Sequence, residues 1–255
     1  MAVVWQATRP RCFRPMRKVD TRDINYNGMA ADYDARRFEG AENAYRERIH
    51  TRSMLQAIGL RDFDRAILDV GSGTCRGLQA MQRAGFRNLR GLELSAEMIT
   101  RGRWKLNPQV PIDRGSAFQL PYRDASFDVV VSWNFLHMFR LELQQELLRE
   151  MTRVCRPGGR VVVELESLHK GLFFTRMAEQ RRRRDTTRFT AVWEVRKLFP
   201  RAVYPHVRAR GAVFPKLYKV LCHTPRLGAV IESAALVPPF NWLAARVVVC
   251  GQKAA

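Results

Sequence analysis

Apolar residues recur along the middle of the chain in two patterns. Five short, largely apolar runs of four to six residues predict buried strands: 66–70, 89–93, 110–113, 127–132 and 160–165. Three intervening segments have helical spacing or helix-starting residues and predict helices: 74–84, 95–105 and 141–155. Strands that alternate with helices favour an α/β fold with a mostly parallel sheet and right-handed crossovers.

The flanking regions are less regular. Two later runs, 203–208 and 246–250, predict further strands, and the apolar, proline-interrupted stretch 212–242 between them predicts an insertion or lid. We expect residues 1–64 to form an N-terminal arm and helical cap that packs over one end of the sheet. Residues 65–255 are then the main domain.

The charge is high and unevenly distributed. The chain has 255 residues and a formal net charge of +20. Segment 171–255 holds 16 of the 44 Lys and Arg but only four of the 24 Asp and Glu. A positive field of this kind attracts anionic partners, which include an anionic membrane, RNA and an anionic substrate. A solvated basic face explains the charge excess equally well.

Cysteine and histidine spacing bounds the chemistry. The five cysteines are scattered without a C-x-x-C pair, and no histidine stands at metal-ligand spacing, so we predict neither a metal nor a disulfide framework. No apolar run approaches the roughly 18–20 residues of a membrane span. We therefore expect a cytoplasmic protein, with peripheral contact at the inner membrane face left open.

The strongest motif follows the first predicted strand. Gly71 and Gly73 allow a tight turn and close approach to a ligand, and the next helix offers free N–H groups. Arg76 stands where a dinucleotide fingerprint has its third glycine. Asp69 would disfavour a pyrophosphate and favour a ligand that carries an ammonium and a sulfonium group.

A second acidic residue strengthens this motif. Glu93 lies at the end of the second predicted strand, where a carboxylate can accept hydrogen bonds from a ribose diol. Four further stretches follow in order: 94–98, 115–122, 126–132 and 148–159. Together these motifs resemble class I S-adenosylmethionine (SAM)-dependent methyltransferases, in particular the ubiquinone and menaquinone biosynthesis branch, most densely over 66–166.

The resemblance implies a Rossmann-like, mostly parallel seven-stranded sheet flanked by helices, with an antiparallel last strand. It implies SAM as methyl donor and S-adenosylhomocysteine (SAH) as product. The methionine part would be surrounded by Asp69, Gly71, Ser72 and Gly73, and the ribose would contact Glu93. The adenine would pack against Leu94 and Met98, with Ser116, Ala117 and Phe118 at its edge, while Trp133 and Asn134 would lie near the sulfonium and the acceptor. Two positions depart from the family pattern. Cys75 replaces a glycine, and Ser116 replaces an acid, which weakens an expected hydrogen bond.

The acceptor chemistry stays open at this point. A base is needed only if the acceptor must lose a proton, and His137 is the candidate, alongside a purely structural role. Tyr26 and Tyr33 are candidates for the acceptor pocket or for helix packing. Three functions remain: methyl transfer to a small-molecule or lipid-linked acceptor, methyl transfer to RNA through the basic C-terminal third, and a non-catalytic SAM-binding subunit.

Overall fold

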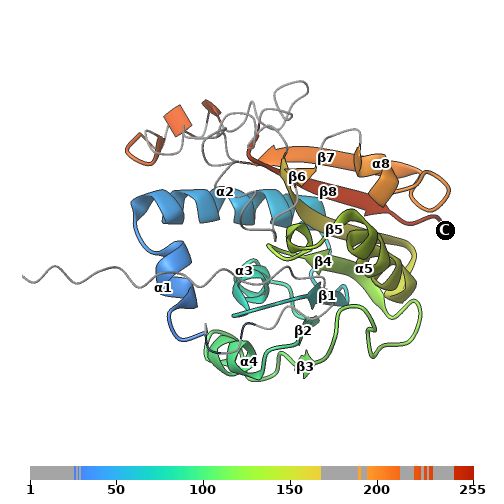
Figure 1. Ribbon diagram of the computed structural model, residues 1–255, viewed down its shortest axis with the longest axis horizontal. Helices are drawn as coiled ribbons and strands as arrows, with labels where there is room; N and C mark the ends of the chain where they lie inside the picture. Colours follow the sequence, from blue (N-terminus) through green and yellow to red (C-terminus); the bar gives the residue numbers. More distant parts are fainter. Residues whose placement is uncertain are drawn as a thin grey trace, which may run out of the picture.

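The computed structural model describes residues 26, 28, 30–167, 189–190, 194–212, 221–224, 227–228, 230–231 and 244–255 (Figure 1). The arginine run 181–184 and most of the predicted lid at 212–242 lie outside these residues, as do residues 1–25 of the predicted arm and cap. Within the described part, no helix is both long and apolar enough to cross a bilayer.

The described helices are α1 (Tyr33–Phe38), α2 (Ala41–Ile58), α3 (Arg76–Arg83), α4 (Ala96–Arg103), the 3-10 turn η1 (Leu136–Met138), α5 (Leu141–Val154) and α8 (Val195–Leu198). The described strands are β1 (Ile67–Val70), β2 (Leu89–Glu93), β3 (Ile112–Arg114), β4 (Phe127–Ser132), β5 (Cys155–Ser167), β6 (Phe189–Thr190), β7 (His206–Ala212) and β8 (Arg246–Gln252). The predicted elements of the middle region therefore form close to where their patterns place them.

The strands form one sheet in the order β3-β2-β1-β4-β5-β8-β7, which confirms the predicted seven-stranded path (Figure 1). Neighbours from β3 to β5 pair in parallel, whereas β8 runs antiparallel to both β5 and β7. The antiparallel last strand is confirmed as well. An eighth strand, the two-residue β6, pairs with the end of β5 off this path, and a segment so short has no detectable period.

The sheet has a separate apolar core on each face, because successive strand side chains point in opposite directions. Leu68 and Val70 of β1 pack in the cluster that includes α5 and α8. Ile67 packs in the cluster that includes α2 and α3. Near-continuous apolar strands such as β1 and β4 are thus explained by burial on both sides.

The junction of α5 and β5 differs from the sequence prediction. The sequence predicts a helix up to residue 155 and a strand from residue 160, whereas β5 begins at Cys155 directly after the helix and includes Pro157, Gly158 and Gly159. The pairing of β4 with β5 shifts register here. A Cβ on Gly159 would lie 2.8 Å from the carbonyl oxygen of Asp128, so glycine permits the close approach of the two strands.

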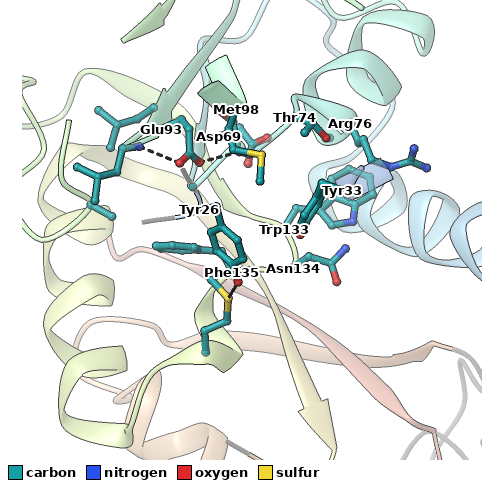
Figure 2. Close-up of a pocket in the computed structure, with 18 of the residues that line it drawn as sticks. Tyr26, Tyr33, Asp69, Thr74, Arg76, Glu93, Met98, Trp133, Asn134 and Phe135 are labelled. Atoms are coloured by element: carbon teal, nitrogen blue, oxygen red, sulfur yellow. Dashed lines mark hydrogen bonds between the residues drawn. The ribbon is translucent and has the colours of Figure 1, made fainter. Parts of the chain in front are cut away.

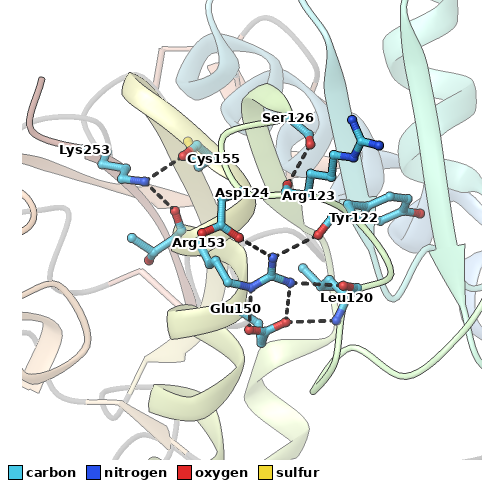
Figure 3. Close-up of polar contacts among 10 residues, drawn as sticks. Leu120, Tyr122, Arg123, Asp124, Ser126, Glu150, Arg153, Cys155 and Lys253 are labelled. Atoms are coloured by element: carbon cyan, nitrogen blue, oxygen red, sulfur yellow. Dashed lines mark hydrogen bonds and ion pairs between the residues drawn. The ribbon is translucent and has the colours of Figure 1, made fainter.

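An arginine of α5 anchors the loop between β3 and β4 (Figure 3). Arg153 donates to the carbonyl oxygens of Leu120 at 3.0 Å and Tyr122 at 2.9 Å. The same guanidinium pairs with the carboxylates of Glu150 and Asp124, both at 2.8 Å. Glu150 in turn accepts from the Leu120 N–H at 3.0 Å. This loop carries part of the candidate site, so the contacts position it against α5.

Candidate functional site

A pocket opens at the carboxyl ends of β1, β2 and β4, the position where sheets of this topology bind ligands. Its empty space is about 890 Å³, including solvent at the mouth. The structure brings most of the sequence-predicted site residues together in its wall: Tyr26, Tyr33, Asp69, Gly71, Ser72, Gly73, Glu93, Leu94, Met98, Ser116, Ala117, Trp133 and Asn134.

Asp69 near the end of β1 is a buried carboxyl group with an unsatisfied oxygen. Only 1% of the residue is exposed, and its Oδ1 has no hydrogen-bond partner among the described residues. Burial, together with the charge of Glu93, raises the pKa of Asp69 to about 7. Because a buried acceptor without a donor is costly, this oxygen is suited to a cationic or N–H-bearing ligand.

Glu93 ends β2 and ties together two ligand-facing turns. Its Oε2 accepts from the Gly73 N–H at 2.8 Å, and its Oε1 accepts from the N–H groups of Leu94 at 3.0 Å and Ser95 at 2.9 Å. The Ser95 hydroxyl then caps α4 by accepting from Met98 N–H at 3.2 Å. The carboxylate is therefore fixed in orientation, and it retains lone-pair sites for a hydroxyl ligand.

The turn between β1 and α3 has three residues in left-handed conformations. Gly71 and Gly73 have φ of +73° and +52°, and Cys75 has φ of +61°. A Cβ on Gly71 would come within 2.5–2.8 Å of the Phe135 ring. Glycine at 71 is therefore required twice, by conformation and by space. Cys75, the departure from the family pattern, still adopts the left-handed conformation that a glycine would take.

Aromatic side chains line the opposite side of the pocket (Figure 2). The rings of Tyr26 and Tyr33 meet edge to face at 5.8 Å, and the Tyr26 hydroxyl donates to the sulfur of Met138. Burial is the main cause that raises the pKa of Tyr26 to about 12, and the nearby Tyr33 adds to this rise. This phenol is thus neutral over the ordinary pH range, and it presents an apolar ring to the pocket.

An ion pair between Glu47 and Arg76 adds polarity to this aromatic side. The Arg76 guanidinium lies 3.8 Å from the centre of the Phe38 ring and 3.2 Å from the carboxylate of Glu47. Burial raises the pKa of Glu47 despite Arg76. Sequence reasoning missed the following lining residues: Phe38, Glu47, Thr74, Arg76, Phe135, Met138 and Phe139. Phe135, Met138 and Phe139 follow β4 closely in sequence, so their position after this strand could have identified them as pocket residues.

A buried network of charged residues forms hydrogen bonds with Asn134 of the pocket wall. Arg246 lies 2.7 Å from Glu164 and 3.5 Å from Glu166, and it also donates to the Asn134 side chain. Glu164 accepts from the Asn134 N–H at 3.2 Å, and His50 lies 3.5 Å from it. Two acids in an apolar strand were the sequence signal for this network, because buried charges require partners.

Two predicted residues do not line this pocket. Phe118 packs edge to face on Phe139 at 5.4 Å, and His137 is buried in η1. The roles predicted for them stay predictions. In the described ranges, no group of three or more His, Cys, Asp or Glu is placed to hold a metal ion.

Comparison with known proteins identifies the central segment. Residues 68–163, which run from within β1 into β5 and include the motif after β1, match the family model "Methyltransferase domain". The match confirms the resemblance drawn from the sequence motifs over this segment, which is less than half of the chain.

Individual relatives agree with this methyltransferase domain. Demethylmenaquinone methyltransferase of Streptomyces griseus is 30% identical over 139 residues, which cover 54% of this chain and 57% of that protein. A ubiquinone/menaquinone biosynthesis C-methyltransferase of Roseobacter denitrificans is 35% identical over 104 residues, covering 38% of this chain and 40% of that protein. The chain thus spans about half the length of these curated relatives.

Solved structures agree on the fold. A SAM-dependent methyltransferase of Thermotoga maritima superposes with a TM-score of 0.62 at 19% identity, covering 89% of this chain and 97% of that one. At this level of identity the likeness concerns the fold alone, which is the Rossmann-like methyltransferase fold.

Proposed function

We propose that the protein is a SAM-dependent methyltransferase that acts on a small-molecule or lipid-linked acceptor. One observation carries the proposal: Asp69 and Glu93, joined by the glycine turn, reach the same pocket from neighbouring strands. Two carboxyl groups in this arrangement suit the two polar parts of SAM, an ammonium group and a ribose diol.

The residues of the pocket fit the methyl donor. The unsatisfied Oδ1 of Asp69 and the Ser72 hydroxyl, which also lacks a hydrogen-bond partner among the described residues, would receive the amino-acid part of SAM. Glu93 would accept from the ribose hydroxyls. Leu94 and Met98 would pack on the adenine, beside Ser116 and Ala117, which line the same wall. No pyrophosphate is expected here, because two acidic groups would repel it.

When bound, SAM supplies a methyl group on a positively charged sulfur, so the hard chemistry belongs to the cofactor. The chain's own residues must orient the acceptor in line and exclude water. The aromatic rings of Tyr26, Tyr33 and Trp133 wall the pocket, and ring faces attract nearby positive charge. Tyr26, whose phenol stays neutral, would serve as wall rather than base.

The acceptor side favours a compact, largely apolar substrate. The Glu47–Arg76 pair lies among the aromatic rings of the pocket wall, where it would orient a hydroxyl or carbonyl group of the acceptor. The names of the curated relatives, which include quinone methyltransferases, point in the same direction. A base role for His137, peripheral contact with a membrane or RNA through 171–255, and a cytoplasmic location remain predictions from the sequence.

Two measurements test this proposal. Calorimetry with SAH should show binding to a single site in the purified protein. Methyl-labelled SAM, incubated with host-cell extract, should then place label in the lipid or small-molecule fraction. Label in RNA that disappears at high salt would contradict the acceptor class and favour RNA methylation. SAH binding with no label in any fraction would favour a non-catalytic subunit, and absence of SAH binding would overturn the cofactor assignment.

A further inference from the structure

A second groove lies on the α2 face of the sheet and includes Arg160 of β5. The methyltransferase pocket lies farther along β5, where Glu164 accepts a hydrogen bond from the pocket residue Asn134. The second groove has about 1150 Å³ of empty space, including solvent at its mouth. Five basic side chains from β5, α8 and β7 line it: Arg160, Arg196, His206, Arg208 and Arg210. Three of the four arginines lie in the basic segment 171–255, but the sequence could not show that they converge on one concavity.

Three of the four arginines of this groove have neutral hydrogen-bond partners. Arg160 donates to the Ile58 carbonyl oxygen at 3.0 Å, and Arg210 donates to the Gln56 side chain at 3.1 Å. Arg196 reaches the Tyr204 carbonyl oxygen at 3.5 Å. Within the part of the chain that the structure describes, no Asp or Glu lines the groove or forms an ion pair with these arginines. Their positive charge is therefore uncompensated by any described carboxylate.

The backbone fixes the spacing of this charge. His206, Arg208 and Arg210 occupy alternate positions of β7, so they share one face at intervals of about 6.6 Å. The positive charges also affect Cys250 of the neighbouring strand. Burial raises the pKa of its thiol, and the charges of Arg160, Arg208 and Arg210 oppose that rise. Several guanidinium groups thus act on one point, and they repel one another unless an anion lies between them.

We propose that this groove binds a phosphate-bearing ligand with at least two negative charges, at a site separate from the methyltransferase pocket. Guanidinium groups bind phosphate oxygens through paired hydrogen bonds, and the concave shape allows several of them to reach one anion. Apart from His206, no described lining residue has an aromatic ring. A groove without stacking surfaces suits a compact phosphate group better than the bases of single-stranded nucleic acid.

The test uses inorganic pyrophosphate as the probe, with the full chain and calorimetry at low and high salt. The wild type should bind it, more weakly as salt rises. Arg208→Gln with Arg210→Gln should weaken binding by about tenfold for each guanidinium removed. Arg101→Gln, an exposed arginine of α4 beside the opposite sheet edge, is the matched control and should leave it unchanged. SAH binding should be equal in all variants, which separates this proposal from the proposed function.

A second arm identifies the source of the phosphate. Vesicles that contain phosphatidate, compared with pure phosphatidylcholine vesicles, test a lipid headgroup in a sedimentation assay. Binding to phosphatidate vesicles that requires Arg208 and Arg210 supports the site and assigns it to a lipid phosphate; pyrophosphate binding alone assigns it to a free phosphate compound. Equal pyrophosphate binding by wild type and the double variant, or no binding of either probe, overturns the proposal. Preference for an RNA oligonucleotide over both probes also overturns it.

Discussion

Asp69 and Glu93 belong to neighbouring parallel strands, and the charge of Glu93 adds to burial in raising the pKa of Asp69 to about 7. The parallel pairing of β1 with β2 brings both carboxyl groups to the carboxyl ends of these strands. Without a ligand, the pocket therefore holds one fixed carboxylate and one carboxyl group that titrates near neutral pH. A cationic ligand would favour the ionised form of Asp69.

This relationship predicts a pH dependence. The pKa of Asp69 is raised in the folded state from its ordinary 3.8, so Asp69 favours folding below about pH 4 and loses that contribution as the pH rises through about 7. The ligand-free Asp69→Asn protein should thus gain stability relative to wild type between pH 4 and 8, measured by urea unfolding. SAH affinity should rise over the same range in wild type and stay low in the variant. A flat wild-type profile would contradict this assignment.

Glu93 is expected to bind the ribose hydroxyls of the methyl donor. Glu93→Gln keeps the size but replaces a charged acceptor, so SAH affinity should fall about tenfold or more in calorimetry. The matched control is Glu97→Gln, a substitution of an exposed carboxylate in the first turn of α4. If Glu93→Gln binds SAH as tightly as wild type, the assignment of SAM to this pocket is wrong.

Arg246 neutralises two buried carboxylates, Glu164 and Glu166. Arg246→Met should lower the free energy of unfolding by about 3–5 kcal/mol, because it leaves buried negative charge without a partner. Arg140→Met breaks an exposed pair with Glu142 and should cost less than about 1 kcal/mol. Urea unfolding measures both. Adding Glu164→Gln to the Arg246→Met protein removes one of the two buried negative charges and should recover part of the loss, and no recovery would refute the electrostatic explanation.

Gly71 and Gly158 give a matched pair of alanine substitutions. Both have φ above +70°, but only a Cβ on Gly71 would meet a neighbour, the Phe135 ring. Gly158→Ala should lose about 1–2 kcal/mol of stability from backbone strain alone. Gly71→Ala should lose more and should also weaken SAH binding, since Phe135 lines the pocket. Equal unfolding energies for the two variants would show that the ring moves without cost.

The sequence by itself determined the order of strands and helices, the parallel sheet and the acidic and glycine positions of the site. These features are local: runs such as 127–132 are apolar because both faces of the sheet are covered, Asp69 lies within β1, and Gly71 follows that strand directly. The antiparallel last strand came from the family resemblance, because hydrophobic periodicity does not give strand direction.

Only the tertiary structure decided which distant residues meet. Arg246 joins Glu164 across an antiparallel strand pair, Glu47 of α2 reaches Arg76, and the arginines of β5 and β7 share one groove. It also showed that His137 is buried outside the pocket wall and that β5 begins at Cys155. Such pairings depend on packing and on strand register over long sequence separations, and hydrophobic periodicity encodes neither.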